Sequence, residues 1–108
     1  MVFNFKAGSG WSFETEFRCF IIYKRLKEEN FPSGMQSDLC RVLAKSYGLS
    51  ESSVKAKVGN YKSEFGDIGA SNSSEATKFI SENFGNLSVA EAEALLTGYL
   101  MGTRGEYA

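Results

Sequence analysis

Side chains that bind phosphate or read base edges are concentrated between residues 40 and 62. This stretch carries five cationic residues and one carboxylate, which gives it a local charge of +4. Lysine and arginine neutralise DNA phosphates, while hydroxyl and amide groups hydrogen-bond to base edges. The residues therefore predict a site for double-stranded DNA that consists of Arg41, Lys45, Ser52, Ser53, Lys55, Lys57, Asn60 and Lys62. The alternative is a structural helical core whose basic face is merely solvated.

The rest of the chain does not share this positive charge. Residues 1–39 carry five cations and five carboxylates, and residues 63–108 carry two cations and seven carboxylates. The acidic C-terminal part weakens the long-range field of the basic segment, so we expect modest DNA affinity. The same part, with its leucine-bearing last helix, also suggests a surface for a protein partner or for a homodimer.

Composition excludes several kinds of active site. The 108 residues contain no histidine, which removes a Ser-His-Asp set, a Cys-His set and a His-bearing zinc site. Cys19 and Cys40 lack metal-ligand spacing and are expected to be reduced core residues. We therefore expect no enzyme activity, no metal and no cofactor. The sequence shows no leader and no apolar run long enough to cross a bilayer, which predicts a cytoplasmic protein.

Five capped amphipathic segments predict an all-α fold. Ser12 precedes a helical apolar period over residues 13–28. The remaining four helices are expected to open at Ser37–Asp38, at Ser50, at Asn72 with Glu75, and at Ser88 with Glu91. The second should end at Gly48 and present an apolar stripe made of Leu39, Val42, Leu43 and Tyr47. The tail is expected to fray from Gly102, and a short strand pairing is suggested only near Phe3 and Phe5.

The second and third predicted helices have the spacing of a helix-turn-helix. Ala44 is small enough for two helices to approach, Gly48 suits the positive φ of the turn, and Val54 returns the second helix to the core. We expect one domain over residues 1–108, with a tri-helical helix-turn-helix core over 10–62 and a C-terminal helical pair over 72–101.

Several motifs then resemble a known family. The segment Gly10–Glu14, Tyr23, the segment Ser50–Tyr61 and the segment Ser71–Ser74 look like the helical module that precedes the nuclease domain in bacterial HNH restriction-type endonucleases. The most specific piece is K-[LV]-G-N-[FY], here Lys57 to Tyr61, and the likeness covers about residues 10–87. It implies a DNA-targeting module, and the W-S-x-E opening is also similar to Myb-like three-helix domains. The nuclease half is missing from this sequence, so cleavage is not implied.

The expected function is that of a non-catalytic DNA-binding protein of phage or mobile-element origin. The alternative is a protein-interaction module, such as an inhibitor of a host defence complex, that uses the same basic face or the acidic C-terminal helix.

Overall fold

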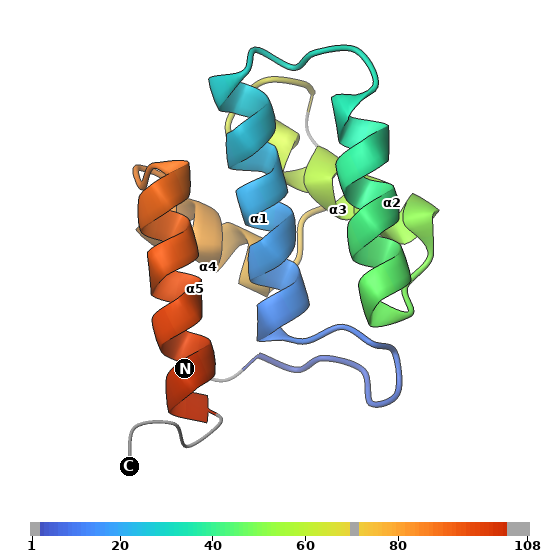
Figure 1. Ribbon diagram of the computed structural model, residues 1–108, viewed down its shortest axis with the longest axis vertical. Helices are drawn as coiled ribbons and strands as arrows, with labels where there is room; N and C mark the ends of the chain where they lie inside the picture. Colours follow the sequence, from blue (N-terminus) through green and yellow to red (C-terminus); the bar gives the residue numbers. More distant parts are fainter. Residues whose placement is uncertain (1–2, 70–71, 104–108) are drawn as a thin grey trace.

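A computed structural model describes residues 3–69 and 72–103, and the regular structure in these residues is helical (Figure 1). The helices are α1 (Phe13–Glu28), α2 (Met35–Tyr47), α3 (Glu51–Glu64), α4 (Glu75–Phe84) and α5 (Val89–Thr103). No strand occurs in the described ranges, which confirms the all-α prediction. The pairing suggested near Phe3 and Phe5 is wrong, because both residues are irregular and the Phe3 ring packs 5.4 Å from that of Phe79.

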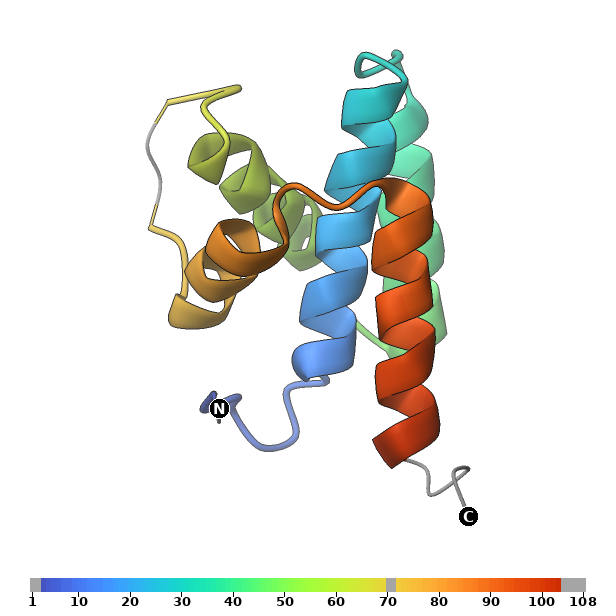
Figure 2. The same ribbon diagram turned by 90° about the vertical axis from the view of Figure 1, so that its left-hand side faces the viewer.

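Helix α1 lies at the centre of two layers. Helices α2, α1 and α5 stand side by side in one layer, and α3 and α4 form the second layer on one face of it (Figures 1 and 2). Helix α1 packs against each of the other four helices, while α5 makes its main helix contact with α1. Helices α2 and α3 also pack against each other, joined by the short turn at Gly48–Ser50.

Three of the predicted N-terminal caps are confirmed. Ser12 accepts a hydrogen bond from the backbone N–H of Thr15 at 3.3 Å, and Thr15 accepts one in return from Ser12 at 2.8 Å. Ser50 caps α3 by accepting a hydrogen bond from Ser53 at 3.1 Å. At the start of α5, the Ser88 N–H donates to the Glu91 carboxylate at 2.9 Å, and this bond lowers the pKa of Glu91. These bonds satisfy backbone N–H groups that a helix start leaves without partners.

Two predicted helix starts are wrong by two residues. Helix α2 begins at Met35 rather than at Ser37, because the turn from Pro32 to Met35 closes with a 3.2 Å hydrogen bond and Gly34, at φ +83°, leads directly into the helix. Helix α4 is capped by Ser74 rather than by Asn72, since the Ser74 hydroxyl accepts from the Thr77 N–H at 3.2 Å.

The end of α5 also differs from the expectation. The helix continues to Thr103, past the predicted fraying point at Gly102. The rest of the expected tail, residues 104–108, lies outside the described residues.

The buried face of α3 is the expected one, whereas the buried face of α2 differs from the expectation at one residue. Val54, Val58 and Tyr61 are all fully buried, as their spacing predicts. Val42, predicted to lie in the apolar stripe of α2, is instead 64% exposed, because the buried side of this helix runs through Cys40, Leu43 and Ala44. Cys19 and Cys40 are buried free thiols, and burial raises the pKa of both.

Replacing Val54 with aspartate should unfold the protein. The side chain has no exposed surface, so the substitution places an unpaired charge in the core at a cost of at least about 3 kcal/mol. Urea unfolding followed by circular dichroism measures the loss. Ser52→Asp, at an exposed position on the same helix, is the control and should leave the midpoint nearly unchanged. A folded Val54→Asp protein with the wild-type midpoint would contradict this packing.

Candidate nucleic-acid interface

The carboxyl group of Glu16 is fully buried where α1, α3 and α4 meet. Its Oε2 atom accepts hydrogen bonds from the Tyr61 hydroxyl of α3 and, at 3.0 Å, from the Thr77 hydroxyl of α4. Its Oε1 atom lies 3.0 Å from the ammonium nitrogen of Lys57 on α3. Burial, followed by the charge of Glu16, raises the pKa of Tyr61 well above its ordinary value of 10.0. One carboxylate therefore joins three helices.

Lys57 belongs to this buried cluster rather than to the protein surface. Its side chain is only 17% exposed, and its ammonium nitrogen lies 5.2 Å from the centroid of the Trp11 ring. A cation over an aromatic face is attracted by the ring quadrupole, so Trp11 covers the ion pair on its solvent side. The contact with Oε1 is electrostatic, since that oxygen accepts no well-aligned hydrogen bond from the described residues. The sequence predicted that Lys57 contacts phosphate, but its ammonium group instead binds Glu16 within the fold.

The motif that carries the family resemblance is largely used to build the fold. Within Lys57 to Tyr61, the two ends reach Glu16 and Val58 is fully buried. Trp11 covers Lys57, and Ser12 caps α1. These residue types and spacings therefore have a structural explanation that needs no ligand.

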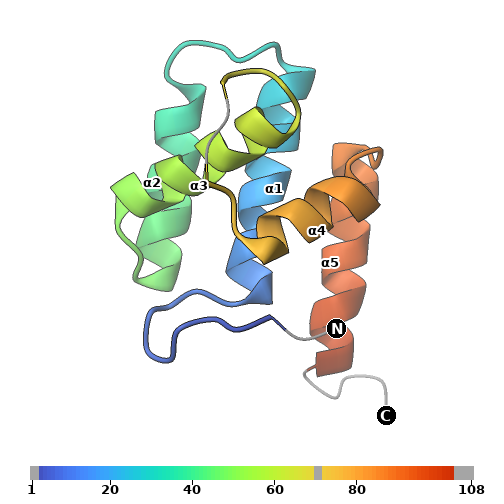
Figure 3. The same cartoon turned by 180° about the vertical axis from the view of Figure 1, so that it is seen from behind.

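The outer face of α3 is the side opposite its buried residues. It consists of small side chains one turn apart, Ser52, Ala56, Gly59 and Ser63, all exposed or half-buried. In Figure 3 this helix lies in front of α1 and α2. Lys55 and Lys62 flank the row on the side of α2, where Lys55 pairs with Glu51 at 2.9 Å and Lys62 donates a hydrogen bond to Gln36.

The other flank of the row holds Ser53 and Asn60. The Ser53 hydroxyl donates to the Ser50 carbonyl at 2.9 Å, within the cap of α3. Asn60 is half-buried and lines a hollow together with Trp11, Lys57 and Ser74. Both side chains therefore lie at the seam between α3 and α4 rather than on the most exposed row.

The two expected cations of α2 are on the surface. Arg41 is 59% exposed and pairs with Asp38 at 2.7 Å, and Lys45 is exposed one turn further along the helix. An exposed ion pair of this kind contributes about 0 to 1 kcal/mol, so a phosphate could replace Asp38 as the partner of Arg41 at little cost. Of the five cations of residues 40–62, Arg41 and Lys45 are exposed, Lys55 and Lys62 are half-buried, and Lys57 is held by Glu16.

The roles of Glu16 and Thr77 were not predicted from the sequence. Glu16 sits in the first turn of α1, where a carboxylate is equally explained by the helix dipole. The missed signal is its position: Glu16 lies three residues after Phe13 and four before Phe20, on the apolar side of its helix. Thr77 carries no comparable signal, because its role depends on how α4 packs.

A cluster of three metal-ligating side chains and a membrane-spanning helix are both absent from residues 3–69 and 72–103. These residues contain no group of three cysteine or carboxylate side chains placed to hold a metal ion. None of their helices combines the length and the apolar character needed to cross a lipid bilayer.

Comparison with protein-family models, with curated proteins and with solved structures gave no match to this chain.

Stability should fall as the pH rises above 10, and Tyr61 should contribute to that fall. The phenol ionises near pH 10 in the unfolded chain but only at higher pH in the native state, because its pKa is raised there. Its contribution is therefore complete below pH 10 and is lost as the pH increases. In Tyr61→Phe the decline should be shallower by up to about 1.4 kcal/mol per pH unit.

Urea unfolding at several pH values between neutral and strongly alkaline measures this slope. Tyr99→Phe, at a position 42% exposed, is the control and should keep the wild-type slope. Equal slopes for Tyr61→Phe and wild type would contradict the burial of the Tyr61 hydroxyl against Glu16.

Proposed function

We propose that this chain is a non-catalytic protein that binds double-stranded DNA through the outer face of α3. In this proposal α3 enters the major groove, Lys55 and Lys62 contact phosphates beside it, and Arg41 and Lys45 of α2 contact the flanking backbone. The observation that carries the proposal is a row of small side chains on an exposed helix with cations along one side. The major groove of B-DNA admits an α-helix, and short side chains let the helix lie close to the bases.

Gly59 supports the close approach of a DNA duplex to the outer face of α3. It lies in the middle of α3, where glycine costs about 1 kcal/mol relative to alanine. Its φ is not positive, and a Cβ atom added there would meet no atom of the described chain within 4 Å. The fold therefore has no need of a glycine at this position, whereas an external surface packed against α3 would need one.

The charges support a limited electrostatic contribution. With Lys57 inside the fold, four cations remain to contact phosphates, namely Arg41, Lys45, Lys55 and Lys62. Each neutralised phosphate contributes about −0.9 to the slope of log affinity against log salt, so the slope should be no steeper than about −3.6. The carboxylates after residue 63 further weaken the field.

The resemblance to the helical module of HNH restriction-type endonucleases favours the same partner. It implies DNA targeting. The proposal also includes a phage or mobile-element origin and action in the cytoplasm. Because the most specific residues of the resemblance are explained by the Glu16 cluster, the proposal places base contacts at Ser52 and phosphate contacts at Lys55, with Ser53 and Asn60 at the edge of the interface.

A protein partner is the second candidate. Arg41 and Lys55 already face carboxylates of this chain, at 2.7 and 2.9 Å, which is the type of partner an acidic protein surface would offer. A docked acidic surface would exchange one carboxylate for another, as an inhibitor of a host defence complex could do. DNA is favoured because the small outer row of α3 fits a groove better than a flat surface.

Removing single surface lysines should weaken DNA binding for every sequence tested. Lys45→Ala and Lys55→Ala should each lower the affinity and flatten the salt slope by about one unit, since each removes one phosphate contact. Titration of a labelled duplex at several salt concentrations measures both quantities. Lys78→Ala, an exposed position on α4, is the matched control and should change neither. Binding that all three variants leave unchanged would reject DNA as the partner of this face.

Gly59→Ala should separate stability from binding. The methyl group should raise the free energy of unfolding by about 1 kcal/mol, because it restores helix propensity without a clash. The same group should weaken DNA binding, because it holds α3 away from the duplex. Thr97→Ala on the exposed side of α5 also improves helix propensity and should leave the affinity unchanged. A Gly59→Ala protein that is more stable and binds DNA with wild-type affinity would exclude the outer face of α3 as the interface.

A further inference from the structure

A trough runs along α1 between α2 and α5, on the side of the molecule away from α3. Helix α1 forms its floor and the two other helices its walls, and this side faces the viewer in Figure 1. The middle of the trough is apolar and includes Ile22, Leu43, Leu96 and Leu100. Val42 on the α2 wall is 64% exposed, the largest exposure among the described large apolar side chains. Such a side chain on the wall of an apolar trough is typical of an interface.

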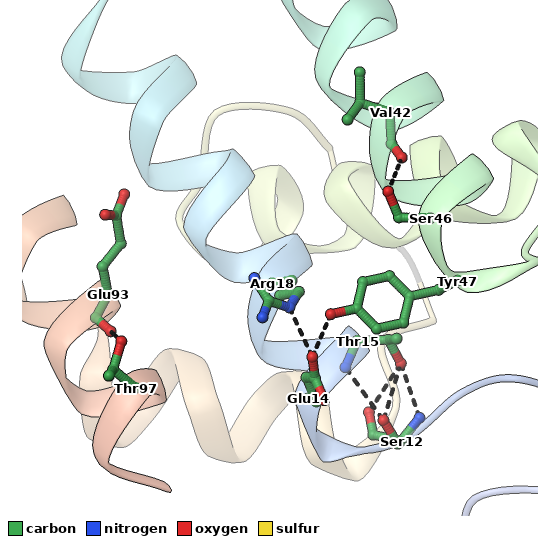
Figure 4. Close-up of polar contacts among 9 residues, drawn as sticks. All are labelled: Ser12, Glu14, Thr15, Arg18, Val42, Ser46, Tyr47, Glu93 and Thr97. Atoms are coloured by element: carbon green, nitrogen blue, oxygen red, sulfur yellow. Dashed lines mark hydrogen bonds and ion pairs between the residues drawn. The ribbon is translucent and has the colours of Figure 1, made fainter. Parts of the chain in front are cut away.

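A cluster of polar side chains lies at one end of the trough. Glu14 accepts a hydrogen bond from the Tyr47 hydroxyl of α2 and one from Arg18 Nε at 3.0 Å (Figure 4). The Arg18 guanidinium carbon also lies 5.5 Å from the centroid of the Tyr47 ring. These contacts fix α2 relative to α1.

The trough carries two cations on its floor. Arg18 and Arg25 lie seven residues apart, two turns along the same side of α1, and both line the trough. Arg25 is exposed and forms no ion pair with a described residue. Glu93, on the α5 wall, is the one carboxylate among the lining residues. The floor therefore favours an occupant that is apolar and negatively charged.

Helix α5 of this same chain has those properties. Its sequence between Val89 and Thr103 contains two carboxylates, Glu91 and Glu93, and no basic residue. It lies at the edge of its layer, and its outward side presents Ala90 and Ala94, both exposed, one turn apart. Small side chains let a second helix approach closely. Helix α5 has apolar residues on several sides, and its contact with α1 covers only one of them.

We propose that the protein forms a two-fold dimer in which α5 of each copy lies in the trough of the other. Each copy has both the helix and the trough, so one symmetry axis covers both surfaces at once and closes the assembly. Glu93 of α5 approaches Arg18 and Arg25 of the partner, and Val42 is buried against the small outer side of the partner helix. The trough contains no residue of α3 and neither Arg41 nor Lys45 of α2, so no proposed DNA contact lines it.

Sedimentation of the full chain over a wide concentration range tests the proposal. Wild type should reach a species of twice 11.9 kDa as the concentration rises. Val42→Glu should remain monomeric and folded, because the position is exposed within one copy and the new carboxylate meets Glu93 of the partner α5. Arg25→Glu should weaken the dimer about tenfold or more, since it replaces the attraction with repulsion.

Lys45→Glu is the matched control. It lies on α2 within one turn of Val42, it is exposed, and it does not line the trough. The larger charge change at this control position should leave the dimer intact, and circular dichroism verifies that each variant is folded. A wild-type monomer at every concentration, or a dimer that Val42→Glu and Lys45→Glu affect equally, would overturn the proposal.

Discussion

The buried carboxylate of Glu16 is the constraint on which the arrangement of the helices depends. A carboxylate with no exposed surface is costly unless donors surround it. Tyr61 of α3 and Thr77 of α4 supply those donors, and Lys57 of α3 supplies a cation. The three side chains reach Glu16 together only when both helices cross α1 at the observed places. The apolar core supplies most of the stabilisation, whereas this cluster selects one arrangement among the many in which apolar faces could meet.

The same constraint separates the two sides of α3. Lys57, Val58 and Tyr61 face inward, so the helix leaves its smallest side chains on the outside. The role of a lysine in a sequence motif on such a helix is then ambiguous. Its spacing is the same whether the side chain contacts a phosphate or a buried carboxylate. Burial resolves the ambiguity for each residue: Lys55 is 39% exposed and Lys57 is 17% exposed.

The sequence predicted local features better than tertiary ones. The bounds of α1 and the caps at Ser12, Ser50 and Ser88 follow from hydrogen bonds within one turn, which sequence spacing encodes directly. The start of α4 does not follow from spacing alone, since Asn72 and Ser74 are both good capping residues. The choice between these two caps depends on placing the Thr77 hydroxyl against Glu16.

The same limit applies to the candidate site. The basic segment was visible from composition, but the inward turn of Lys57 depends on Glu16, forty-one residues earlier in the chain. The exposure of Val42 likewise depends on how α2 is rotated against α1. No local pattern contains these long-range choices, because each is set by which helices meet in three dimensions.

A double-mutant cycle between Glu16 and Lys57 tests the central claim most directly. Glu16→Gln, Lys57→Met and the double variant are compared with wild type by urea unfolding. Because Lys57→Met leaves a buried carboxylate without its cation, it should cost about 3 kcal/mol or more, and the double variant should recover a large part of that loss. Costs that simply add, with Lys57→Met within about 0.5 kcal/mol of wild type, would contradict the account.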